Sequence, residues 1–172
     1  MSFSRIRHNF AVECEAMLNK QINMELHASY VYQSMASYFH RDDVALKGFH
    51  KFFQKLSQEE REHSNKLMKY VNERGGAVVL HAVNKAEKDS WGSGLEALEA
   101  ALQLEKTVYQ SLLDIHKMAS SNADPHLTNW LEDDFLNEQV ETIYQMSSHI
   151  TNLKRVGTGL GEYLFDKETL DS

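Results

Sequence analysis

The chain has 172 residues, a formal net charge of −7 and 42% hydrophobic residues. This length predicts one domain with a buried core, and the acidic balance argues against a nucleic-acid partner, because nucleic-acid binding leaves a basic surface. No stretch approaches the roughly 20 apolar residues of a membrane span, the N-terminal MSFSRIRHNF holds no signal-peptide run, and the single cysteine, Cys14, suits a reducing cytoplasm.

Five helices are expected in chain order, separated by short segments of turn-forming residues. The second helix ends at Gly75, the first of two glycines that form a helix C-terminal signal. Ser93 begins a capping-box pattern that opens the third helix. Asp124 as N-cap, with Pro125 at the first helical position, opens the fourth. The expected helices cover about residues 10–39, 44–74, 93–120, 125–156 and 161–170.

The four long helices are expected to pack as a bundle. At about 1.5 Å per residue each spans roughly 40 Å, and long helices of matched length favour bundles. Short turns make the first two helices antiparallel, and likewise the third and fourth. Residues 77–93 are long enough to carry the chain back along the bundle. The predicted fold is therefore all-α: a four-helix bundle with one long crossover and a short fifth C-terminal helix, forming a single domain over residues 1–172.

Polar residues interrupt the apolar stripe of each long helix near its middle. The stripes contain Glu25 in the first helix, Glu60 and His63 in the second, Glu105 in the third and Gln139 in the fourth. Counted from the turn centres at residues 43 and 122, Glu25 lies 18 residues away, and Glu60, Glu105 and Gln139 each lie 17 away. Antiparallel pairing therefore brings three carboxylates, one imidazole and one amide to the same depth inside the bundle.

A divalent metal would explain this buried polar level. Several buried carboxylates are costly without compensation, and an oxygen-rich site with one nitrogen suits a hard or borderline metal. Glu60 and His63 form a Glu-x-x-His pattern, which places both side chains on one helix face. The alternative for any single residue is ordinary core chemistry: a paired acid, or packing in the case of Tyr32. A second Glu-x-x-His is absent, since Gln139 and Thr142 occupy those positions, so the second metal position is expected to be ligand-poor.

Motifs along essentially the whole chain resemble the ferritin family, specifically its catalytic heavy-chain type. They are QINMELHASYVY, QEEREHSNKLMKYVNERGG, LQLEKTV, DPHL, LNEQV, HITNLKR and GEYLFDKETL, in the family's order. The Glu-x-x-His pattern is also that of the ferritin-like di-iron bundles. The resemblance implies a ferritin-like fold and a ferroxidase centre that takes two iron ions per subunit.

The resemblance implies a role for each candidate residue. Glu25 and His63 resemble ligands of the first iron, with Glu60 bridging, and Glu105 and Gln139 resemble second-site residues. The catalytic set is completed by Tyr32, which resembles the tyrosine that orients them: Glu25, Tyr32, Glu60, His63, Glu105 and Gln139.

The implied function is iron storage and detoxification. The protein would oxidise Fe(II) to Fe(III) with dioxygen and store ferric mineral inside a cytoplasmic shell of twenty-four subunits, either alone or mixed with other ferritin chains. The resemblance implies iron as the only cofactor, with no organic cofactor. Carboxylate ligands favour this chemistry because they stabilise Fe(III) more than Fe(II).

Further residues resemble family positions outside the centre. Glu59 and Glu62 lie beside the stripe and resemble inner-surface acids that nucleate mineral, although an ordinary solvated face is the alternative and Asn65 replaces a third acid. A three-fold iron channel would present a His, an Asp and a Glu. The matching residues are His116, Asn129 and Glu132, with Thr128 in place of a Cys; the tail offers Leu160, Leu164 and Glu168 to a four-fold axis.

Two alternative functions stay open at this point. One is a catalytically weak ferritin storage subunit, which would share the shell and oxidise little iron; the centre residues argue against it. The other is a metal-free helical bundle that acts as an interaction protein, such as a cytokine. The lack of a signal peptide and of disulfides, together with the buried polar residues, argues against this second alternative.

Overall fold

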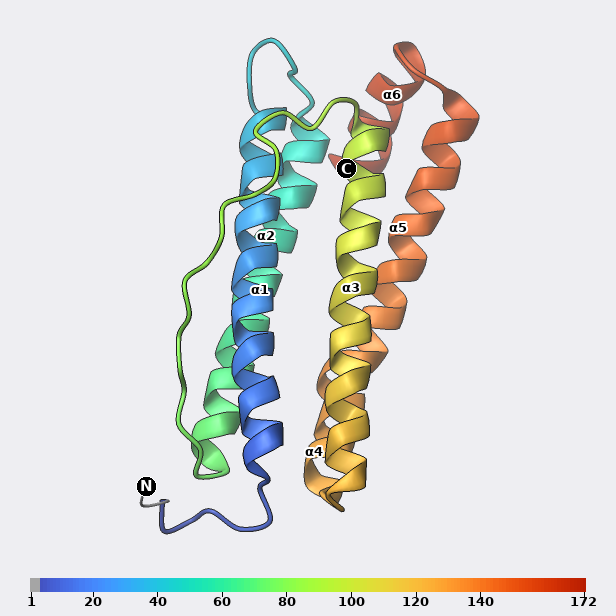
Figure 1. The fold of residues 1–172 in the computed structure, drawn as a ribbon. Coiled ribbons are helices and arrows are strands. Elements are labelled where there is room, and N and C mark those ends of the chain that lie inside the picture. The colour runs from blue at the N-terminus through green and yellow to red at the C-terminus, as the bar shows by residue number, and fades with distance from the viewer. Residues whose placement is uncertain (1–3) are drawn as a thin grey trace.

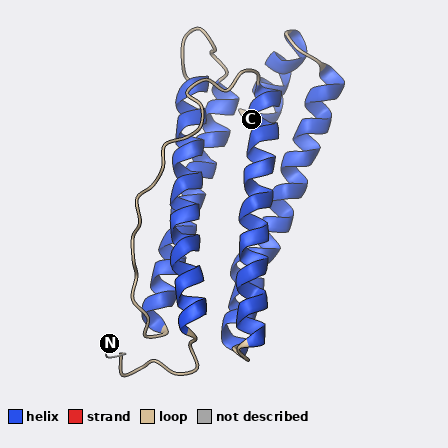
Figure 2. Ribbon diagram, in the orientation of Figure 1, coloured by secondary structure: helices blue, strands red, loops and turns tan. Residues whose placement is uncertain are grey.

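The computed structural model describes residues 4–172, and every regular element in this range is helical (Figure 2). Residues 1–3, which open the N-terminal stretch in which no signal peptide is expected, lie outside the described residues. Two long helical hairpins stand side by side, joined by a crossover, and a short helix lies near the C-terminus (Figure 1). The expected four-helix bundle with a short C-terminal helix is thus confirmed.

The first hairpin pairs α1 (Val12–Phe39) with α2 (Lys47–Glu73). The expected start of α2 at residue 44 is wrong by three residues. Ala45 adopts a φ of 52°, and its amide donates to the carbonyl of Arg41 at 2.7 Å, which closes a turn instead of a helix. At the other end Gly75 has a φ of 78°, so the glycine stop of α2 is as expected.

The second hairpin pairs α3 (Gly94–Ser121) with a fourth helix made of three consecutive parts. Ser93 and Glu96 form the expected capping box, and the Asp124 side chain accepts a hydrogen bond from the amide of Leu127 with Pro125 at the first position. The fourth helix is not regular throughout. Its parts are α4 (Pro125–Leu131), the π-helical η1 (Glu132–Leu136) and α5 (Asn137–Val156).

The crossover, residues 77–93, runs along the outside of α1 (Figure 1). Side chains of α1 fix it at several heights: the Asn19 Oδ1 accepts from the Val79 amide at 2.8 Å, and the Asn23 amide donates to the Ala82 carbonyl at 3.0 Å. These bonds satisfy backbone groups that lie outside any helix. The crossover brings the chain back to the end where α2 began, so α2 and α3 are parallel.

The C-terminal segment, α6 (Leu160–Leu164) followed by the π-helical η2 (Phe165–Leu170), covers one end of the bundle. Asp166 is buried and accepts from the Phe49 amide at 2.8 Å, and Glu162 accepts from the Gly94 amide at 3.0 Å. Both acids thereby satisfy amides at helix N-termini, where negative charge is favoured.

Buried apolar side chains form two clusters. One lies at the end covered by α6 and η2 and includes Phe49 and Phe165. The other lies at the opposite end and includes Leu67. On α1 the change between clusters falls between Ile22 and Ala28, so the bundle has a break in its apolar core near mid-height. No helix among the described residues is long and apolar enough to cross a bilayer.

Candidate metal centre

The break in the core is filled by polar side chains from all four long helices. Their positions on the stripes turn them inward, and each is buried, from 1% exposed for Glu25 and Glu105 to 9% for His63. Helical spacing accounts for one pair, since Glu60 and His63 lie one turn apart on the same face of α2. The layer contains Glu25 of α1, Glu60 and His63 of α2, Glu105 of α3 and Gln139 of α5.

Three of these residues form a compact ligand set. Glu25, Glu60 and His63 each offer one ligand atom, and these atoms all lie within 4.8 Å of one another. The His63 Nδ1 lies 3.2 Å from the Glu60 Oε2. Gln21, one turn before Glu25, donates to its Oε1 at 3.0 Å, whereas the buried Oε2 has no hydrogen-bond partner among the described residues. An unpartnered buried carboxylate oxygen facing a carboxylate and an imidazole suits a cation.

The other predicted residues form a second, hydrogen-bonded group beside the first. The Tyr32 hydroxyl donates to the Glu105 Oε1 at 2.6 Å. The Gln139 amide donates to the Glu105 backbone carbonyl at 3.0 Å and to its Oε2. Both carboxylate oxygens of Glu105 are therefore held by neighbours, so this group is poorer in available ligands than the first.

The electrostatics of the layer reflect crowded buried acids. Burial, and then the neighbouring Glu60 carboxylate, raise the pKa of Glu25 well above its usual value. Burial is also the main reason why the pKa of Glu60 is well raised, with Glu105 adding repulsion. The same burial and the Glu105 charge raise the pKa of Tyr32. Without a cation these carboxyls tend to keep protons, and a divalent cation would release them.

Two residues of the site were missed by the sequence reasoning. Glu138 Oε1 lies 3.1 Å from the Nε2 of His63, so both ring nitrogens of this histidine face carboxylates. Glu138 is half-exposed. It lies one position before Gln139 in the sequence, and it is therefore not on the predicted apolar stripe. Gln21, which in turn accepts from Ser111 at 2.6 Å, holds Glu25. Its spacing of four residues before Glu25 was the available signal.

The predicted nucleation acids lie outside this layer. Glu62 is exposed, and Glu59 is partly exposed and 3.7 Å from Lys55. Partial burial is the main cause that raises the pKa of Glu59. Glu59 and Glu62 therefore occupy a surface next to the metal centre and do not contribute to the compact ligand set. Their role in mineral growth stays a prediction.

The predicted channel residues lie at the other end of the second hairpin from α6. The His116 Nε2 of α3 is 2.8 Å from the Glu132 Oε1, so these two side chains meet. Asn129 on α4 is exposed. A three-fold channel requires neighbouring subunits, so its assignment stays a prediction. Leu160, at 71% exposed, and Leu164, at 44%, leave the tail surface open.

Comparison with known proteins agrees with this class of fold and site, a helical bundle with a buried carboxylate–histidine layer. Residues 15–156 match the ferritin-like domain family. The whole chain is 62% identical over 172 residues to the soma ferritin of Lymnaea stagnalis, covering 99% of that protein. It is 55% identical over 170 residues to the middle subunit of Salmo salar ferritin, covering 97% of each chain. It is 54% identical over 170 residues to the lower subunit of Aquarana catesbeiana ferritin, covering 97% of this chain and 98% of that one.

The chain belongs to the ferritin family. Family membership makes it an iron-storage protein, and it implies iron binding and assembly into an oligomeric shell.

Proposed function

We propose that this chain is a catalytically active, heavy-chain-type ferritin subunit that oxidises Fe(II) with dioxygen. The observation that carries the proposal is the compact set of Glu25, Glu60 and His63, in which the Glu25 Oε2 has no other partner. A subunit that only contributes to a shell has no need of buried, unpaired acids, because they oppose folding. In the proposed function these acids bind Fe(II), which is the substrate.

Each residue has a defined task in this proposal. Glu25 and His63 bind the first Fe(II), and Glu60, which lies between the two polar groups, bridges to the second. Gln21 orients Glu25 through its amide. Binding two divalent ions displaces the protons that burial retains on Glu25 and Glu60. The anionic carboxylates then stabilise Fe(III) relative to Fe(II), which favours electron transfer to dioxygen.

The second group favours release of the product. Glu105 is already engaged by Tyr32 and by Gln139, and an amide is a weaker ligand than a carboxylate. An ion held there is expected to be bound less tightly than the first. Ferric product leaving this position would pass to the inner surface, where Glu59 and Glu62 assist mineral growth.

We propose that twenty-four copies of the chain assemble into a cytoplasmic shell, and that residues 1–172 form one domain. Iron would enter this shell through a channel lined by His116, Asn129 and Glu132. No organic cofactor is needed.

The deciding experiment mixes iron-free, anaerobic protein with two Fe(II) per subunit and then admits air. Rapid growth of ferric absorbance, with the protein eluting as a cage in size exclusion, is the expected result. A cage with slow oxidation would instead identify a storage subunit with little activity. A monomer that takes up no iron would contradict both functions.

A further inference from the structure

A ladder of aromatic side chains leads from the metal centre toward the end of the bundle where α3 meets α4. The ring centroids of His63 and Phe135 are 5.5 Å apart, and those of Phe135 and Trp130 are 5.1 Å apart. Trp130 then stacks on Tyr70 at 4.0 Å with an angle of 20° between the rings. We call Phe135, Trp130 and Tyr70 the aromatic ladder. Its rings are in van der Waals contact from the metal-ligand candidate His63 outward.

The outer end of the aromatic ladder is Tyr70, whose hydroxyl makes two polar contacts. The Arg74 Nη1 donates to the Tyr70 oxygen at 2.6 Å, and the same oxygen lies 2.9 Å from the His126 Nδ1. A guanidinium only donates, so the phenol proton is left for another acceptor, and the Nδ1 of His126 accepts it in the neutral tautomer that carries its hydrogen on Nε2. The ring of His126 is exposed and can pass a proton to solvent.

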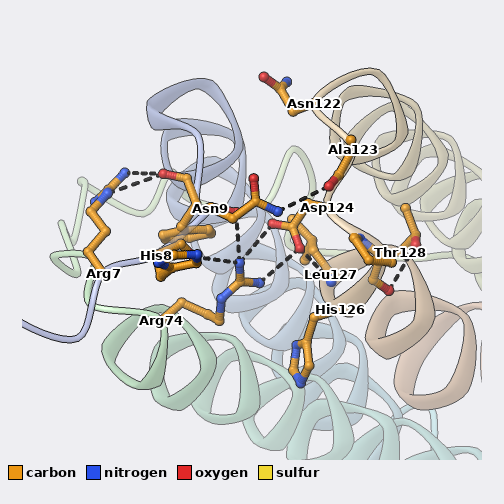
Figure 3. A network of polar contacts seen from close by, with 12 residues as sticks. Arg7, His8, Asn9, Arg74, Asn122, Ala123, Asp124, His126, Leu127 and Thr128 are labelled. Atoms are coloured by element: carbon orange, nitrogen blue, oxygen red, sulfur yellow. Dashed lines mark hydrogen bonds and ion pairs between the residues drawn. The ribbon is translucent and has the colours of Figure 1, made fainter.

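Other contacts hold Arg74 in place. Its Nη2 is 3.0 Å from the Asp124 Oδ2 and donates to the Asn9 carbonyl at 3.0 Å, as Figure 3 shows. The ion pair is buried on the Asp124 side, where the side chain is 1% exposed. The donor to Tyr70 is thus preorganised, and the direction of the phenol proton does not depend on a mobile surface arginine.

Tyrosine and tryptophan are the side chains that most readily lose one electron. When a tyrosine loses an electron it also loses its proton, so a base already bonded to the hydroxyl makes the step easier. Burial raises the pKa of Tyr70 to about 12, which keeps the phenol protonated at neutral pH until such a step occurs. Tyr70 is 3% exposed, so a radical formed there is shielded from solvent.

We infer that the aromatic ladder donates a single electron to the metal centre when hydrogen peroxide meets one Fe(II), and that Tyr70 becomes the neutral radical. This inference rests on the proposed function. Two Fe(II) ions reduce dioxygen by two electrons to hydrogen peroxide. A lone Fe(II) then supplies one electron too few to reduce that peroxide to water, and an oxidising radical would result. The ladder supplies the missing electron.

The step balances in atoms and electrons. The peroxide O–O bond breaks, one electron comes from Fe(II) and one from Tyr70, and two water molecules and Fe(III) form. Reduction of the peroxide consumes two protons. The phenol releases one proton through His126 to solvent. The peroxide takes up two protons from solvent, so the net consumption is one proton. The ladder therefore acts as a protective reductant that moves damage away from the ligands of the centre.

The test mixes anaerobic cages carrying one Fe(II) per subunit with one equivalent of hydrogen peroxide, followed by freeze-quench electron paramagnetic resonance. We expect a tyrosyl signal that changes shape when the protein contains ring-deuterated tyrosine. Tyr70→Phe should lower its amplitude several-fold. Trp130→Phe, which keeps a packed ring that is hard to oxidise, should lower it as well.

Tyr38→Phe is the matched control, because Tyr38 also packs on a phenylalanine ring but lies at the opposite end of the bundle. It should leave the signal at the parent amplitude. A signal that is unchanged in Tyr70→Phe and lost in Tyr32→Phe would place the radical at the centre itself and overturn the inference. If Tyr70→Phe does not assemble, the Trp130→Phe result decides in the same way.

A second arm separates this inference from the proposed function. With two Fe(II) per subunit and air, the parent, Tyr70→Phe and Trp130→Phe cages should oxidise iron at equal initial rates. If the parent oxidises iron slowly, the proposed function fails and the inference fails with it. If the parent is fast and the tyrosyl signal is the same in Tyr70→Phe, only the inference fails.

Discussion

At the candidate metal centre, the acids that would bind a cation oppose folding when no cation is present. Glu25 and Glu60 are buried next to each other, and both have a raised pKa, so ionising them in the iron-free protein opposes folding. A group with a raised folded pKa contributes stability below its unfolded pKa, near 4.3. That contribution is lost as the pH rises through the folded value.

Glu60→Gln should therefore stabilise the iron-free protein, and by more at pH 8 than at pH 5. The substitution removes the free-energy cost of ionising a buried carboxyl without changing the volume, and we expect a gain on the order of 1–4 kcal/mol. Thermal unfolding of iron-free protein at both pH values measures the effect. Glu62→Gln, on an exposed position of the same helix, should change stability by less than about 0.5 kcal/mol. Equal gains for the two variants would argue against crowding at the centre.

Glu60→Ala and His63→Ala should each abolish fast oxidation while the shell remains assembled. Each removes a ligand from the compact set, and even losses in the surroundings of a metal ligand cost about 10–100-fold in affinity or activity. Stopped-flow absorbance at two Fe(II) per subunit measures the rate, and size exclusion checks assembly. Oxidation at the parent rate in either variant would refute the site.

Combined Glu59→Ala and Glu62→Ala substitutions should spare early oxidation and slow mineral growth at high iron loading. Both side chains lie outside the compact ligand set, so the centre is left unchanged. Iron uptake followed over many additions of Fe(II) separates the two phases. Parent-like growth at every loading would show these acids to be an ordinary solvated surface.

At the scale of elements, the proposed iron channel lies at the start of the fourth helix. A negatively lined channel concentrates Fe(II) and accelerates its arrival. Asn129 on α4 is neutral, so in the proposed channel Glu132 would contribute most of the negative electrostatic potential. The Glu132 Oε1 already lies 2.8 Å from the His116 Nε2. Delivery, rather than chemistry, is then expected to limit oxidation when Fe(II) is scarce.

Asn129→Asp should raise the initial rate at low Fe(II) and low salt by about two- to tenfold, at the lower end of steering effects. Added salt should reduce the gain, because the Debye length is about 10 Å at 0.1 M. At saturating Fe(II) the two proteins should converge. Equal rates at low iron and low salt would mean that residue 129 does not line the working path.

At the scale of the whole molecule, one subunit leaves substantial apolar surface open. Leu160 is 71% exposed, Leu80 63% and Tyr163 53%, on the tail and the crossover. Apolar surface of this kind usually marks interfaces. Light scattering at micromolar concentration should give a closed, heat-resistant cage, whereas a monomer or dimer would contradict the proposed assembly.

The bundle and much of the centre could be predicted because their signals are local. Helical periodicity, the Ser93 capping box and the Asp124 N-cap each depend on a few neighbouring residues. The turn at Ala45 could not be predicted in this way, since alanine seldom adopts a positive φ. The apolar stripe was read with a regular α-helical period, and the π-helical η1 departs from that period. The contact between Glu138 and His63 depends on how α5 packs against α2.

The crossover along α1 also sets an order of events for a newly made chain. Each hairpin contains mostly contacts between neighbouring helices and can form early, as local contacts do. Alignment of the two hairpins requires closing a long loop, and the bonds of Asn19 and Asn23 to the crossover set its height. Glu25 and Glu60 come from the first hairpin and Gln139 from the second. During synthesis the compact set of Glu25, Glu60 and His63 can therefore form with the first hairpin, whereas the second group is completed only after the last long helix has left the ribosome. A half-made subunit thus lacks the paired iron positions that the proposed oxidation requires.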